Sequence, residues 1–175
     1  MRADLPARAG AADYHRGMYF DALSFLEDER DAWRPYEALF TLSPGQLEQP
    51  VVGPDRWSAR DLLGHLVFWQ ERALAVAREL AVGSTSPSRQ RDEAEWEARG
   101  DEINADAVAA WRALPLDELL ERARTVAGEL RGHLTVVPEA RWLKDGAVQA
   151  FFAGETVDHY AEHAADLAAI LAAAR

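Results

Sequence analysis

Four long segments of this chain place apolar residues at every third or fourth position, which is the spacing of one face of an α-helix. These segments are residues 19–42, 58–82, 116–138 and 155–174. No stretch alternates apolar and polar residues for long enough to predict a β-strand. We therefore predict an all-α protein built as a four-helix bundle.

Local signals indicate where the helices begin and end. Pro35 removes a backbone donor and clashes with the preceding turn, which predicts a kink or a helix boundary near Trp33. Ser58 and Asp61 have the spacing of a capping box, and this predicts the start of the second helix. Gly83 and the polar run after it predict that helix's end.

A long connection, residues 84–114, separates the second and third helices. Its apolar residues within 92–113 predict a short extra helix, in one or two pieces. Because the connection is long, the helices that it joins need not be antiparallel neighbours, and we expect a crossover topology. We interpret residues 138–154 as a loop.

The charge balance excludes one large class of partner. The chain has 19 Lys and Arg against 30 Asp and Glu, a net charge of −11. This field repels a phosphate backbone, so we expect no nucleic acid partner. The apolar runs are all shorter than the roughly 20 residues that span a membrane, so we expect no membrane partner either. The chain has no Cys, and thiol chemistry therefore needs a thiol from another molecule.

The first residues differ in character from the rest of the chain. Residues 1–17 mix charged and small residues and lack the apolar stretch of a secretory signal, so we interpret them as a flexible arm of a cytoplasmic protein. Residues 18–175 have a length that suits one domain.

Three histidines lie on helix faces that the apolar pattern directs inward. His159 and His163 are four residues apart, so they share a face of the last helix, and His65 lies between Leu62 and Trp69 on the stripe of the second. A single inward His is more often a satisfied core residue. Three of them compete for few acceptors, whereas one divalent cation satisfies all three. We predict that they bind one such ion, Zn²⁺ or Ni²⁺, and leave a coordination position for water or a thiolate.

The remaining polar candidates receive weaker interpretations. We interpret His15 in the arm and His133 near the end of the third helix as surface residues. Tyr160 fits a cavity, an interface or the core. Three carboxylates flank the last helix, and we expect them to face solvent or to orient a ligand: Glu155, Asp158 and Glu162.

Two motifs resemble those of the DinB/YfiT-like superfamily of metal-binding four-helix bundles. The first is the segment from Trp57 to Leu66 followed by Trp69, and the second is the late His159-Tyr160-x-x-His163. The resemblance covers most of residues 20–174 and implies that His65, His159 and His163 are the metal ligands. The superfamily includes mycothiol-dependent maleylpyruvate isomerases and thiol transferases. The isomerase branch often has Glu where this chain has His159, which counts against a maleylpyruvate-specific assignment.

A second group is also similar. Residues 101–104 and 155–160 resemble segments of ClbS/DfsB-type self-protection proteins, and this implies hydrolysis or sequestration of a reactive small molecule. The first resemblance implies a metal-dependent S-transferase or isomerase that acts on a small electrophile, with a low-molecular-weight thiol as co-substrate. A non-catalytic metal-binding protein remains a further alternative. The aromatic segment around Trp96 and Trp111 suggests a homodimer.

Overall fold

The structure is a computed structural model that describes residues 18–51 and 57–175, so the predicted arm at 1–17 lies outside it. The described residues form helices joined by turns and loops and contain no β-strand, as predicted. None of their helices is long and apolar enough to cross a membrane. The elements in chain order are α1 (Ala22–Trp33), η1 (Arg34–Thr41), α2 (Pro44–Leu47), α3 (Ala59–Val82), α4 (Pro87–Ala113), α5 (Leu116–Leu134), η2 (Glu139–Arg141), α6 (Gly146–Glu155), α7 (Val157–Glu162) and α8 (Ala164–Ala173).

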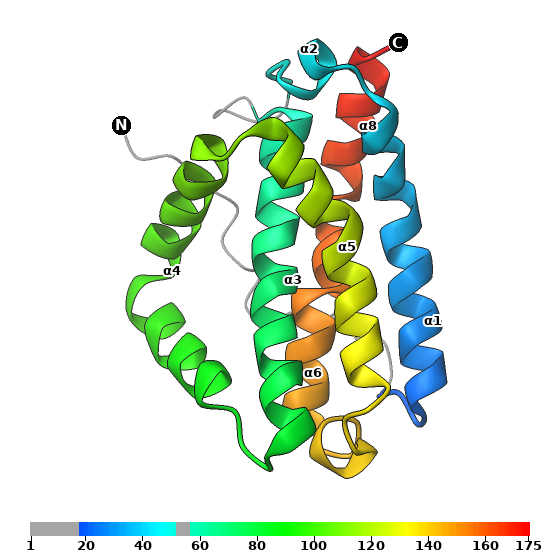
Figure 1. Cartoon of the computed structure of the whole chain (residues 1–175), viewed down its shortest axis with the longest axis vertical. Helices are drawn as coiled ribbons and strands as arrows, with labels where there is room; N and C mark the ends of the chain where they lie inside the picture. The colour runs from blue at the N-terminus through cyan, green and yellow to red at the C-terminus, as the bar shows by residue number, and fades with distance from the viewer. Residues whose placement is uncertain (1–17, 52–56) are drawn as a thin grey trace.

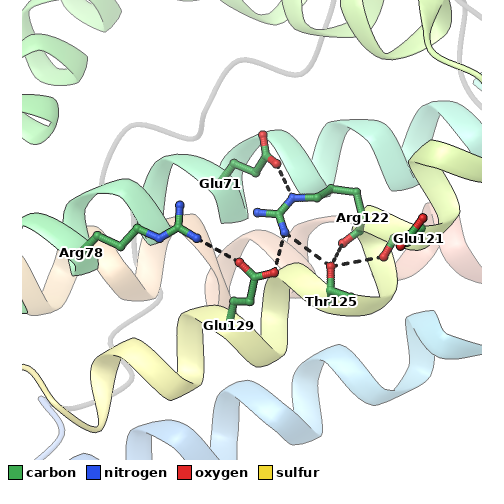
Figure 2. A network of polar contacts seen from close by, with 6 residues as sticks. All are labelled: Glu71, Arg78, Glu121, Arg122, Thr125 and Glu129. Atoms are coloured by element: carbon green, nitrogen blue, oxygen red, sulfur yellow. Dashed lines mark hydrogen bonds and ion pairs between the residues drawn. The ribbon is translucent and has the colours of Figure 1, made fainter.

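Four rods form the bundle: α1 with η1, α3, α5, and the nearly continuous line of α6, α7 and α8 (Figure 1). Helix α4 lies outside the bundle against α3 (Figure 1). Two ion pairs join α3 and α5: Glu71 pairs with Arg122 at 2.5 Å, and Arg78 pairs with Glu129 at 3.1 Å (Figure 2). Because the residue numbers increase along both helices from the first pair to the second, α3 and α5 are parallel neighbours. Helix α4 carries the chain back between them. The crossover topology expected from the length of the connection is therefore present.

The ion pairs between α3 and α5 form a small ladder on the surface. Arg122 binds both Glu71 and, at 2.8 Å, Glu129 (Figure 2). These side chains are partly exposed, so water and salt weaken each pair to about 0–1 kcal/mol. The ladder thus fixes the register of the two helices more than it stabilises them.

The helix boundaries predicted near Trp33, at Ser58 and at Gly83 are all found, and the last is the C-cap of α3. Helix α1 ends at Trp33, and the chain continues through Pro35 as the 3₁₀-helix η1. At the start of α3 the Ser58 hydroxyl accepts from the Asp61 amide at 3.2 Å, and the Asp61 carboxylate accepts from the Ser58 amide at 3.0 Å. This reciprocal capping box fixes the first turn of the helix that carries His65.

Two parts of the chain are more helical than the sequence indicated. Helix α4 has 27 residues with a non-helical backbone at Arg99, so it is two helical pieces and longer than the predicted short helix. The interpretation of residues 138–154 as a loop is wrong, because they contain η2 and most of α6. The Asp145 carboxylate caps α6 by accepting from two backbone amides. Glycines at 146 and 154 and small residues between them hide the helical pattern.

A group of buried polar side chains connects all four rods, and we call it the glutamate cluster: Glu29, Gln70, Arg131 and Tyr160. Arg131 pairs with Glu29 at 2.6 Å, and the Tyr160 hydroxyl donates to Glu29 at 3.0 Å. The Gln70 amide donates to the same hydroxyl at 2.8 Å. Tyr160, whose position the sequence left open, is therefore a core residue. Burial raises the pKa of the Glu29 carboxyl, although Arg131 opposes this shift.

Candidate metal centre

The structure brings together the three histidines that the sequence directed inward, and we call them the histidine cluster: His65, His159 and His163. His65 belongs to α3 and His159 to α7, while His163 lies at the junction of α7 and α8. Their side chains are buried, and one ring nitrogen from each lies within 4.8 Å of the others. Among the described residues, this is the group that has the composition and spacing of a metal centre.

The spacing of the rings suits one shared ion. The Nε2 atoms of His65 and His159 are 2.9 Å apart, and the ring centroids lie 4.8 to 4.9 Å from one another. A tetrahedral ion with bonds of about 2.1 Å holds its ligand nitrogens about 3.4 Å apart. Shifts of about 1 Å in the rings therefore give each nitrogen a bond to one ion.

A hydrogen bond between two of the rings satisfies the three histidines less completely than a shared ion does. It uses Nε2 of His65 and Nε2 of His159 and places one proton between them. The Nδ1 atom of His65 is buried and has no hydrogen-bond partner among the described residues. The hydrogen bond leaves the His163 ring outside the pair, whereas a cation engages all three rings.

A break in the helix positions His163. Its backbone, with φ −93° and ψ 7°, ends α7 and forms the N-cap of α8. The Nδ1 atom of His163 lies 2.8 Å from the Asp166 carboxylate, which accepts its proton and leaves the Nε2 lone pair free for a metal. Sequence reasoning missed Asp166, although its spacing of three residues from His163 on a helix is a usable signal.

The carboxylates that the sequence did single out have different surroundings. Glu162 lies 3.8 Å from Nδ1 of His159, which fits the orienting role considered for it. Glu155 is buried and Asp158 is partly buried, so the expectation that Glu155 faces solvent is wrong.

Two tryptophans form walls beside the rings. Trp57 lies 4.9 Å from His65 and stacks on His163 at 5.9 Å, between ring centroids. Trp69 lies 5.8 Å from His159. These large apolar side chains exclude water and strengthen the interaction of any charge with the site.

Burial also fixes the protonation state of His65. Removal from water, together with the neighbouring His163, lowers the pKa of His65 to about 3. His65 is therefore a neutral imidazole near neutral pH, which is the form that binds metals.

The other aromatic and histidine residues lie elsewhere. His133 is partly buried in the last turn of α5, and His15 lies outside the described residues. Trp111 is buried, and Trp96 contacts Trp69 at 5.3 Å, so both tryptophans pack within their own chain. The homodimer that they suggested stays a prediction.

The fold and the site together define the class of this protein: a helical bundle with a candidate metal centre made of three buried histidines. The chain belongs to the DinB superfamily, because the model of that family matches residues 11–166. The matched range includes all three histidines. No curated protein and no solved structure gives a significant match.

Proposed function

We propose that this protein is a divalent-metal-dependent enzyme that acts on a small electrophile with a low-molecular-weight thiol as co-substrate. The observation that supports the proposal is the histidine cluster, in which ring nitrogens of His65, His159 and His163 lie within 4.8 Å of one another. Three neutral imidazoles leave part of the coordination sphere of Zn²⁺ or Ni²⁺ to a ligand from outside the chain. The reaction class that fits is S-transfer or isomerisation.

Each side chain around the cluster has a definite task in this proposal. His65 stays neutral, and Asp166 holds His163 in the tautomer that presents Nε2. Trp57 and Trp69 exclude water. A divalent cation, when bound, supplies the positive charge that favours a thiolate over a thiol. The chain has no Cys, so the thiol comes from another molecule, in the cytoplasmic setting that we predict.

The second candidate is hydrolysis or sequestration of a reactive small molecule at the same site. The resemblance of residues 101–104 and 155–160 to self-protection proteins favours it. Asn104 of the first segment, on α4, is buried. A metal-binding role without turnover is the remaining alternative.

The test is a conjugation assay with 1-chloro-2,4-dinitrobenzene and a panel of low-molecular-weight thiols. We expect conjugation that requires added Zn²⁺ or Ni²⁺, that is lost in His65→Ala and that is retained in His133→Ala. His133 is the matched control, because it lies outside the histidine cluster. Metal-dependent hydrolysis of an activated ester without thiol dependence would select the second candidate. Neither activity, with the ion retained, would select the role without turnover.

A further inference from the structure

Asn104, on α4, is a buried polar residue that the proposed site does not use. Its exposed fraction is 5%, and its Oδ1 atom is buried and accepts no hydrogen bond from any described residue. A buried carbonyl without a donor costs free energy, and an apolar residue of the same size avoids this cost. The Oδ1 atom of Asn104 is therefore not explained by a hydrogen bond within the described residues.

The position of Asn104 on α4 is well defined. Asn104, Ala107 and Trp111 are three and then four residues apart and are all buried, so they form the stripe that covers the bundle. A Cβ atom added to Gly64 would lie 2.7 Å from the Cβ of Trp111, which is too close for two carbon atoms. The missing side chain of Gly64 thus lets α4 approach α3 one residue before His65.

Two contacts bracket Asn104 within the stretch of α4 that runs along the part of α3 with His65. Helix α4 is antiparallel to α3, since Arg112 pairs with Asp61 at one end and Asp92 pairs with Arg72 at the other. Between these ends, Trp111 meets Gly64, and Trp96 meets Trp69. Asn104 lies between the two contacts on α4, and the matching stretch of α3 contains His65.

The bend in α4 falls inside the same interval. Between the Trp111–Gly64 contact and the Trp96–Trp69 contact lie residues 97–110 of α4 but only residues 65–68 of α3. The chain of α4 therefore follows a longer path between these two contacts than that of α3. The backbone leaves the helical region at Arg99, with φ −146° and ψ 25°, and α4 bends midway along its length (Figure 1). The stripe of α4 that carries Asn104 thus faces the part of α3 beside the histidine cluster.

We propose that Asn104 binds the substrate, by accepting a hydrogen bond from an uncharged N–H or O–H group of a molecule that also coordinates the ion. The aromatic side chains of Trp69 and Trp96 offer the apolar surface for the rest of that molecule. The assignment rests on the proposed metal site. It adds a substrate class, which is a metal-coordinating small molecule with an amide or hydroxyl donor.

The test compares two thiol probes that differ by one group. N-acetylcysteamine has an amide N–H where 2-mercaptoethyl acetate has an ester oxygen. The full chain is loaded with Co²⁺, and each thiol is titrated while the visible absorption of the ion is recorded. We expect the amide to bind about threefold to tenfold more tightly than the ester, which is the effect of one neutral hydrogen bond.

Asn104→Leu is the decisive variant, and Ala105→Leu on the exposed side of α4 is its control. We expect Asn104→Leu to abolish the preference for the amide and to raise the unfolding temperature by about 2–5 °C, because the unpaired carbonyl is gone. Ala105→Leu is expected to leave the preference intact. Equal binding of the two thiols by the natural chain, a preference retained in Asn104→Leu, or a lower unfolding temperature in that variant would each overturn the assignment. Failure of both thiols to change the Co²⁺ spectrum contradicts the proposed thiol-dependent function and removes this assignment with it.

Discussion

The glutamate cluster and the histidine cluster both bury polar side chains between α3 and α7, but only in the first does a charged group face an opposite charge of the chain, although Oε1 of Gln70 has no partner there. Glu29 has a cationic partner in Arg131, and the Tyr160 hydroxyl both donates and accepts. In the histidine cluster, two ring nitrogens face each other at 2.9 Å and another, Nδ1 of His65, has no partner among the described residues. A carboxylate with a cationic partner holds a fold together, whereas three imidazoles that face one another without a cation suit a bound ion.

The two clusters are close neighbours, which makes the comparison informative. His159 and Tyr160 are consecutive residues of α7, and His65 and Gln70 lie on the same helix. Burial disfavours charge in both places, raising the pKa of Glu29 and lowering that of His65. The clusters therefore differ in their partners and not in their depth, and substitutions in the glutamate cluster should cost more stability than those in the histidine cluster.

The largest expected effect on stability is that of Glu29→Ala. The change removes the partner of Arg131 and of the Tyr160 hydroxyl, so we expect the free energy of unfolding to fall by about 2–4 kcal/mol. Urea denaturation of the metal-free protein measures it. The compared change, His65→Leu, removes the unpaired Nδ1 atom together with the Nε2 contact to His159, and we expect a smaller loss of about 1 kcal/mol. A loss in His65→Leu as large as that in Glu29→Ala would contradict the distinction between the clusters.

The next effect concerns the support of one ligand. Asp166→Asn keeps the size of the side chain but accepts the His163 proton more weakly, so we expect the affinity for Zn²⁺ to fall about tenfold to a hundredfold. Competition with a chromophoric chelator measures this affinity. Asp117→Asn is the control, because Asp117 is exposed in the first turn of α5 and lies outside the histidine cluster. Equal losses in the two variants would show that Asp166 does not orient His163.

The smallest effect is a pH dependence of the metal-free protein. The pKa of His65 is about 3 in the fold against 6.5 for an ordinary histidine, so below pH 6.5 the unfolded chain takes up a proton that the folded chain does not. Stability conferred by neutral His65 is complete above about pH 6.5 and falls as the pH decreases, by about 1 kcal/mol between pH 6.5 and 5.5. Urea midpoints across this range should show a steeper fall for the natural chain than for His65→Leu. Identical pH profiles would contradict the buried, neutral state of His65.

Much of this organisation can be predicted from the sequence because it depends on local pattern. The apolar spacing in α3 and α5 predicts both helices, and it predicts the inward direction of His65, His159 and His163 because each lies on an apolar stripe. Helix α6 escapes prediction, since glycines at 146 and 154 and its small residues weaken the pattern.

What the sequence did not predict depends on partners that are distant in the chain or on breaks in helices. Glu29 looks like a surface residue until Arg131, 102 positions later, is placed beside it. The break at His163 lies three residues before its partner Asp166, and the break at Arg99 divides α4 into two helical pieces. Such features follow from the packing of the whole bundle and not from spacing along one helix.

Metal content tests the central claim most directly. Plasma emission analysis of the natural chain, after exposure to Zn²⁺ or Ni²⁺ and dialysis, should find about one ion per chain. His65→Ala, His159→Ala and His163→Ala should each lose most of it, while His133→Ala keeps it. Undiminished metal in the three cluster variants, or no bound metal in the natural chain, would contradict the assignment of the histidine cluster as a metal centre.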